Sequence, residues 1–391
     1  MRKLSFIMIL LFCATLTYAQ KGKVAQASSY FASGKLDEAK RLIDEAITHE
    51  SCVNFDKAYF TKGQIYQGIF ESPLKEYKRL DPQALDKAWE AFQKVIELDV
   101  KNKYTKRLAT QYQNLVIDFT NQAIEYYGAE NYKGALASFK RVLEIENSPI
   151  LTEEAPAKID TAVIFNAGIA AQKAGEFAEA EKFYKEALKY DYEPARTYAF
   201  LANALKEQGK EEEALTYLHK GYELFPENSF MLVELINYYL MGGQPEKAEV
   251  YLDAAIKQDP KNASFYRAKG TLYEKMEQKD KAIEMYQKTL ELDPKDFSAL
   301  FNSTNLKLAK VVEYHKQVDN IIDVNEYNKE IAKVLDQFEG LIPDFEKALS
   351  LRPDDKNTML VLKELYFRVR DRDPKYQQAY DDMQAKLGNA Q

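Results

Sequence analysis

The chain has 391 residues, of which 46% are hydrophobic and 29% are charged, a balance typical of a folded globular protein. Its two cysteines exclude a disulfide scaffold, and its three scattered histidines argue against a zinc site. Lys and Arg number 54 against 61 Asp and Glu, giving a net charge of −7 without a long basic block. This charge argues against a nucleic-acid partner.

The N-terminal segment has the three parts of a secretion signal. A positive start at Arg2-Lys3 precedes an apolar run of 13 residues, Leu4–Leu16, and small residues at 17 and 19 precede Gln20. The run is shorter than the roughly 20 residues that span a bilayer as a helix. We therefore expect a signal peptide over 1–19 and an exported chain, either periplasmic or associated with the outer envelope of a Gram-negative bacterium. The alternative is an N-terminal anchor that is never cut.

Cys52 is the single cysteine that remains after such a cleavage. A lone thiol in an oxidising compartment is either a small buried hydrophobe or a free reactive group. His49 lies close enough in sequence to suggest a Cys–His pair, but no glycine-rich turn would expose the sulfur. We therefore expect Cys52 to be buried and not catalytic.

A repeat organises the rest of the chain. In each unit a small residue is followed four positions later by a large apolar residue, and three positions after that by a small or branched one. Between Ala180 and Ala282 the small residue recurs in three successive steps of 34 residues. Such spacing marks one buried face of a helix, and a helix pair of this kind must stack on its neighbours to cover that face. The full set is Ala39/Ile43/Ala46, Ala88/Phe92/Val95, Ala135/Phe139/Val142, Ala180/Tyr184/Ala187, Ala214/Leu218/Gly221, Ala248/Leu252/Ala255 and Ala282/Tyr286/Thr289.

Glycine and proline punctuate this repeat. We expect glycine in a left-handed conformation at the turn within each helix pair, and proline after the second helix. The glycines are Gly34, Gly175, Gly209 and Gly242-Gly243, and the prolines are Pro226, Pro260 and Pro294. The pattern resembles the tetratricopeptide repeat family, whose 34-residue unit folds as two antiparallel helices. The resemblance implies an all-α, right-handed solenoid of stacked antiparallel helix pairs.

The resemblance is not uniform along the chain. It is strongest over 161–296, four contiguous units, and looser over 20–149 and 297–391. An insert near 68–82 lengthens the connection inside one N-terminal unit. A C-terminal unit over 297–355 carries an apolar helical extension at 306–340, which either packs back on the repeats or acts as a docking arm or dimerisation seam. Residues 356–391 are predicted to form two amphipathic capping helices, as a terminal repeat requires.

Sequence motifs for catalysis and cofactor binding are absent. The chain has no G-x-x-x-x-G-K-[ST], no G-x-G-x-x-G after a strand, no H-E-x-x-H and no G-x-S-x-G. Its acidic pairs and runs, such as Glu211-Glu212-Glu213, suit first helical turns, where carboxylates meet the helix dipole favourably. We therefore predict no enzyme activity, no cofactor and no metal site.

Family members commonly bind protein segments in a concave groove lined by the first helix of each unit, so the resemblance implies such a groove here. Members that clamp a C-terminal carboxylate need basic and amide residues at fixed phases, where this chain matches only at Asn203 and places the repelling Glu234. The mixed lining better suits an extended or helical peptide with apolar anchors. We expect the groove residues at exposed positions of the first helices, with the alternative that several of them, the aromatic ones included, only pack between repeats. These residues are Phe165, Ile169, Arg196, Phe200, Asn203, Phe230, Asn237, Arg267 and Glu274.

The leading hypothesis from sequence is an exported scaffold that binds one or more proteins through this groove. One alternative is an envelope accessory protein that binds carbohydrate or cell wall, for which the 27 tyrosines could supply stacking faces. Most of those tyrosines fall at core positions of the repeat. Another alternative is a structural protein that assembles with itself through 306–340.

Overall fold

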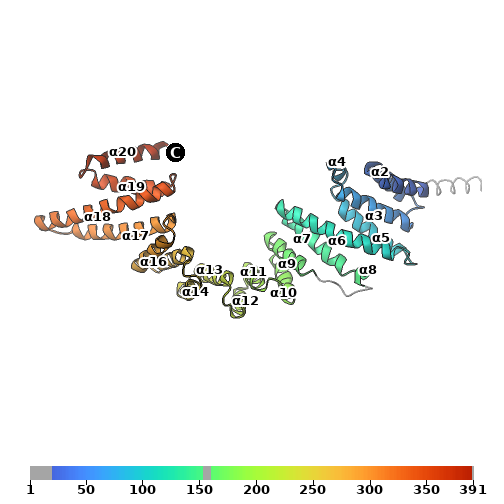
Figure 1. Cartoon of the computed structure of the whole chain (residues 1–391), viewed down its shortest axis with the longest axis horizontal. Helices are drawn as coiled ribbons and strands as arrows, with labels where there is room; N and C mark the ends of the chain where they lie inside the picture. The colour runs from blue at the N-terminus through green and yellow to red at the C-terminus, as the bar shows by residue number, and fades with distance from the viewer. Residues whose placement is uncertain (1–19, 153–159, 390–391) are drawn as a thin grey trace, which may run out of the picture. The chain divides into compact units, whose positions relative to one another are not determined.

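A computed structural model describes residues 20–152 and 160–389, so the predicted signal peptide over 1–19 lies outside the described residues. Within them every regular element is a helix, which confirms the expected all-α fold (Figure 1). The chain divides into two compact units, Met1–Tyr217 and Leu218–Gln391, with the boundary inside helix α12. We describe each unit by itself.

Unit 1 is a series of helix pairs, coloured from blue to green in Figure 1. Residues 20–32 are helical and precede the first labelled helix. Helix α3 packs on α5, α6 on α7, and α9 on α10, while α7 packs on α9 and α10 on α11. The helices are α2 Leu36–Ile47, α3 Asp56–Glu71, α4 Lys75–Lys78, α5 Ala84–Leu98, α6 Thr105–Gly128, α7 Tyr132–Glu146, α8 Pro149–Thr152, α9 Thr161–Lys173, α10 Phe177–Leu188 and α11 Pro194–Glu207.

Unit 2 continues the same arrangement from the second half of α12 Glu211–Leu224. Consecutive helices pack on one another from α13 through α20. They are α13 Ser229–Met241, α14 Pro245–Gln258, α15 Ala263–Lys275, α16 Lys279–Leu292, α17 Phe297–Val318, α18 Val324–Leu351, α19 Lys356–Val369 and α20 Pro374–Asn389.

The repeat positions form the core of both units, as their spacing predicts. The small residues from Ala39 to Ala282 are fully buried, and Tyr184 and Tyr286 are among the largest side chains with no exposure. Each tyrosine packs directly on a glycine of the preceding helix. A Cβ atom added at Gly168 or Gly270 would lie 2.6 Å from the facing tyrosine ring, closer than packed atoms approach. Glycine is therefore required where the two helices of these pairs meet.

The turns within the helix pairs share one geometry. Gly34, Gly175, Gly209 and Gly243 all have positive φ, between 66° and 78°, as predicted for these turns. The next residue donates its backbone N–H five residues back, for example from Glu176 to Ala171 at 2.8 Å. This bond satisfies a carbonyl that the helix end leaves open. Glu277 fills the same position in the α15–α16 turn, with φ 59°.

The starts of three first helices in unit 2, α13, α15 and α17, are fixed by side-chain caps. Asn228, Asn262 and Asp296 recur at the 34-residue step, two residues after Pro226, Pro260 and Pro294. Each accepts a hydrogen bond from a backbone N–H in the first turn of its helix. Such a cap stabilises a helix by about 1 kcal/mol.

The extension expected over 306–340 consists of the distal parts of two long helices, α17 and α18, which turn at residues 319–323. Asp323 caps α18 by accepting a hydrogen bond from the Glu326 N–H at 2.8 Å. Helix α19 packs along α18, and the Tyr376 hydroxyl at the start of α20 donates to Glu339 at 2.8 Å. The two C-terminal helices therefore cover part of the extension.

Cys52 is fully buried between α2 and α3, as expected. Its surroundings are those of a small core residue. Among the described helices, none combines the length and the apolar character that a membrane crossing needs.

Candidate protein-binding surface

An apolar pocket of about 220 Å³ opens on the first-helix surface of unit 1. It is lined by Ile124 and Tyr127 of α6, Phe139 of α7, and Asn166 and Ile169 of α9. Phe139 is buried and forms the floor, whereas the Ile124 side chain is 61% exposed. The exposed Ile124 side chain leaves apolar surface in contact with solvent, and a side chain of a partner could cover it.

A stack of two aromatic rings and one arginine lies beside this pocket. The Phe165 and Phe200 rings are 5.8 Å apart and almost parallel, at 15°. The Arg196 guanidinium carbon lies 5.7 Å from the first ring centroid and 5.6 Å from the second. Ile169, in the pocket, is one turn of α9 beyond Phe165. Arg196 is thus held on the aromatic rings next to the pocket by cation–π attraction.

Phe165 does not lie at an exposed position and instead packs between repeats. Its residue is only 3% exposed, because the rings of Tyr184, Tyr192 and Phe200 surround it at 5.5 to 6.0 Å. Phe165 therefore supports the surface from beneath. Arg196 remains exposed, and its one ion pair in the described part of the chain is a loose contact of 3.9 Å with Glu193.

A chain of hydrogen bonds orients the polar edge of this surface. The Tyr184 hydroxyl donates to Gln172 Oε1 at 2.7 Å, and Gln172 Nε2 donates to Asn203 Oδ1 at 2.7 Å. Burial raises the pKa of the Tyr184 hydroxyl, so it stays a neutral donor. With its oxygen engaged, Asn203 presents its amide N–H groups from an exposed position on α11.

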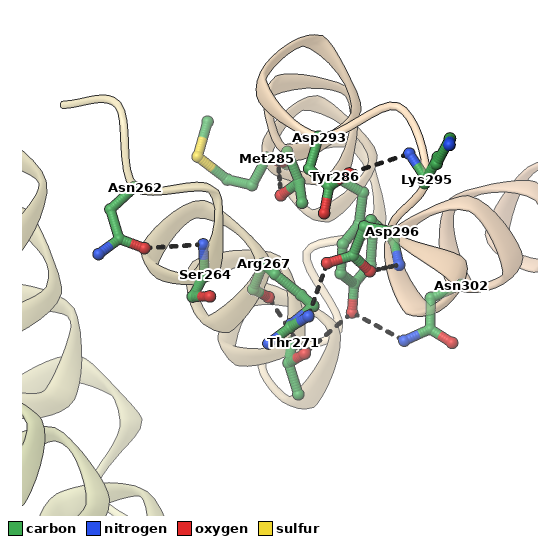
Figure 2. A network of polar contacts seen from close by, with 12 residues as sticks. Asn262, Ser264, Arg267, Thr271, Met285, Tyr286, Asp293, Lys295, Asp296 and Asn302 are labelled. Carbon is green, nitrogen blue, oxygen red and sulfur yellow. Dashed lines mark hydrogen bonds and ion pairs between the residues drawn. The ribbon is translucent and has the colours of Figure 1, made fainter.

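In unit 2 the predicted groove residue Arg267 is engaged by Asp296 inside the unit (Figure 2). Arg267 Nη1 donates to Asp296 Oδ2 at 2.6 Å, and the Asp296 side chain is only 6% exposed. Its other oxygen accepts the Ala299 N–H at 2.9 Å and caps α17. This pair joins α15 to α17, so Arg267 is half-buried rather than exposed as expected.

Glu274 is exposed but accepts a hydrogen bond of 2.8 Å from the Tyr286 hydroxyl. Burial raises the pKa of Tyr286 to about 12. Thr271 and Asn302 lie at 3.2 and 3.3 Å from the same hydroxyl. Glu274 and Arg267 therefore make contacts that stabilise the packing of the helices within unit 2.

The remaining predicted residues differ in exposure. Asn237 is exposed on α13, and Phe230, Phe200 and Ile169 are partly buried. Ile169 is the predicted residue that lines the pocket. Sequence reasoning missed its other lining residues, although the exposed pair Ile117 and Ile124, seven residues apart on α6, is a readable apolar signal.

No group of three or more His, Cys, Asp and Glu side chains in residues 20–152 and 160–389 could hold a metal ion. The surface on unit 1 combines an apolar pocket, one cation and amide donors. These are groups that bind a ligand by contact and hydrogen bonding.

The described structure and the sequence together define a class, the helix-hairpin repeat proteins. Residues 165–229 and 263–296 each match a family model of the tetratricopeptide repeat. The chain therefore contains tetratricopeptide (TPR) repeats, as the 34-residue spacing predicts.

Several named proteins share this sequence pattern. The chain is 24% identical over 301 residues to the TPR repeat-containing protein MJ1428 of Methanocaldococcus jannaschii, covering 66% of this chain and 53% of the relative. It is 26% identical over 204 residues to the human protein O-mannosyl-transferase TMTC1, covering 49% of this chain and 23% of the relative. The chain thus spans about half the length of the first relative and less than a quarter of the second.

Solved TPR structures resemble parts of the chain. YrrB, described as a TPR protein with an unusual peptide-binding site, aligns with a TM-score of 0.37 and 21% identity, over 51% of this chain and 97% of YrrB. A tetratricopeptide repeat protein from Parabacteroides merdae aligns with a TM-score of 0.41 and 16% identity, over 64% of this chain and 98% of that protein.

Proposed function

We propose that the chain is an exported, non-catalytic scaffold that binds a protein segment on the first-helix surface of unit 1. The observation that carries the proposal is the apolar pocket at Ile124 and Ile169 beside the ring-supported Arg196. TPR repeats generally bind proteins or peptides, and the apolar run over 4–16 in the sequence supports export.

The partner that suits this surface is a peptide with an aliphatic or aromatic anchor for the pocket. A few buried anchors supply most of the binding energy of such an interface. Arg196 adds a donor for a carboxylate or carbonyl oxygen of the peptide, and the Asn203 amide adds another. Both groups are already positioned by their neighbours, so little conformational entropy is lost when a peptide binds.

The test is a selection of short displayed peptides on residues 20–391, followed by affinity measurements on the selected peptides with two matched variants. Ile124→Glu places a charge at the pocket, and we expect it to weaken binding roughly 30-fold or more. Ile117→Glu makes the same change at a residue 59% exposed on the same helix but outside the pocket lining. It should change affinity less than about twofold. Equal effects of the two variants would contradict the proposal.

The carbohydrate alternative has less support. Sugar-binding sites need exposed aromatic faces, and among the described aromatic residues only Tyr190 and Phe367 are exposed, at 39% and 44%. The Arg370 guanidinium lies 3.7 Å from the Phe367 ring centroid and covers that ring. Self-assembly through 306–340 keeps one supporting observation, since Ile322 and Val324 at the turn of that hairpin are 96% and 69% exposed. Sedimentation of an Ile322→Asp/Val324→Asp variant against the unaltered chain would test it, and an unchanged mass would exclude this turn as a contact.

A further inference from the structure

The loop between α5 and α6 and the start of α6 are strongly basic. Lys101, Lys103, Lys106 and Arg107 fall within seven residues of a chain whose net charge is −7. All four are exposed. Local charge here is therefore opposite to that of the whole molecule, and this feature plays no part in the peptide surface.

Nearby carboxylates neutralise little of this charge. Asp56 pairs with Lys103 at 3.4 Å. Asp99 is buried and accepts a hydrogen bond from the Tyr104 N–H at 2.6 Å, so its carboxylate stabilises the loop and pairs with none of the four cations. Glu97 pairs with Lys94 at 2.5 Å.

The other three cations remain available to a ligand. Lys101 and Lys106 have no ion pair with any residue that the structure describes, 20–152 or 160–389. The Arg107 guanidinium lies 4.1 Å from the Phe60 ring centroid, which holds it in place without neutralising it.

Apolar side chains project from the same end of unit 1. Val100, at the tip of the loop, is 90% exposed. Val53, in the α2–α3 connection, is 43% exposed, and the pair between Lys103 and Asp56 brings that connection beside the basic loop. Exposed aliphatic residues among lysines are the composition that binds the interface of a bilayer with anionic lipids.

The first described residues of unit 1 also lie at this end. The Lys21 ammonium is 5.2 Å from the ring centroid of Phe55, at the end of the α2–α3 connection. In the sequence, the apolar run Leu4–Leu16 ends five residues before Lys21. Five residues reach at most about 18 Å. A bilayer that holds this run, during export or afterwards, is therefore within reach of the basic loop.

We infer that this basic face, defined by Val53, Val100, Lys101, Lys103, Lys106 and Arg107, binds the surface of an anionic lipid bilayer. The lysines contact headgroup phosphates, and Val100 enters the interfacial layer. Nucleic acid suits the face less well, because Phe60 and Tyr104 are covered by Arg107 and offer no free ring for a base. The inference is independent of the peptide surface on α6, α9 and α11.

The experiment measures co-sedimentation of residues 20–391 with vesicles of phosphatidylcholine alone and of phosphatidylcholine mixed equally with phosphatidylglycerol. We expect binding to the anionic vesicles only, weakened by added salt. Lys101→Gln/Lys106→Gln removes two surface charges, each contributing about a factor of five, so the partition coefficient should fall roughly 30-fold. Val100→Ser should lower it several-fold and leave the salt dependence unchanged.

The matched control is Lys257→Gln/Lys261→Gln, which removes the same charge from exposed positions of unit 2 without ion pairs in the described structure. It should change the partition coefficient less than about twofold. Equal loss in both double variants would show a net-charge effect and overturn the inference. Binding to phosphatidylcholine alone, or to soluble heparin but not to anionic vesicles, would overturn it too.

Discussion

Helix pairs α9–α10 and α15–α16 are separated by three repeat lengths along the sequence and have the same internal packing. Gly168 and Gly270 occupy equivalent positions, each under the ring of a buried tyrosine. The two tyrosine hydroxyls donate to equivalent side chains, Gln172 at 2.7 Å and Glu274 at 2.8 Å. The repeat therefore reproduces packing and hydrogen bonding together.

The two pairs differ at the residue that precedes this glycine by three positions. In α9 it is Phe165, which lies under Phe200 and Arg196. In α15 it is Arg267, which pairs with the buried Asp296 at the start of the next repeat. An aromatic residue at this position supports an exposed cation, whereas an arginine there is used to join neighbouring helices. In these two pairs, the residue at this position separates a surface with an exposed cation from one where the cation is used in an internal ion pair.

The largest expected effect comes from breaking the framework that both pairs share. Gly168→Ala and Gly270→Ala each force a methyl group against a tyrosine ring and should lower the free energy of unfolding by about 2 kcal/mol. Gly340→Ala, in α18, meets nothing within 4 Å and should raise it by about 1 kcal/mol. Denaturant titration measures all three. A neutral Gly168→Ala would show that the α9–α10 contact can relax.

The difference between the two pairs is sharpened by removing each arginine. Arg267→Ala leaves the Asp296 carboxylate buried without its ion pair and should cost about 2 kcal/mol of stability. Arg196→Ala removes an exposed guanidinium and should cost less than about 0.5 kcal/mol. Its effect should appear instead in the affinity for selected peptides. Equal stability losses would mean that Arg196 also holds the fold together.

A smaller effect concerns the pH dependence of stability, and it arises where Glu71 at the end of α3 meets Asp118 of α6. Burial, with the adjacent Asp118 carboxylate as a second cause, raises the pKa of Glu71 to about 7. Because the folded state holds this proton more tightly than the unfolded chain, its contribution to stability is present at low pH and is lost as pH rises from about 4.5 to about 7.

Since solvent screens this carboxyl, the loss should be about 1 kcal/mol. Glu71→Gln should remove that part of the pH dependence, as measured by unfolding at a series of pH values. Gln67 Nε2 donates to Asp118 at 2.7 Å and should keep the pair of helices together in the variant. An unchanged pH profile in Glu71→Gln would assign the titration to another group.

The sequence alone supplies the parts of the fold that repeat. The core alanines, the glycine turns and the prolines after second helices follow from local rules applied at a fixed period. The Asx caps follow the same period and could have been read as well. Cys52 was placed in the core because nothing around it would expose the sulfur.

The properties of the candidate surface depend on contacts across the repeats. The burial of Phe165 is decided by Tyr184, Tyr192 and Phe200, which come from later elements. Arg267 finds its partner 29 residues away. Helix periodicity reports which face a residue takes, but it does not report what the next helix pair places on that face.

The caps at Asn228, Asn262 and Asp296 give each of these hairpins its own start signal at a constant distance from the last. A whole hairpin duplicated or deleted at this interval would leave the register of every other hairpin intact. The length of the array, and with it the number of first-helix surfaces, can therefore change in evolution one hairpin at a time without redesign of the core.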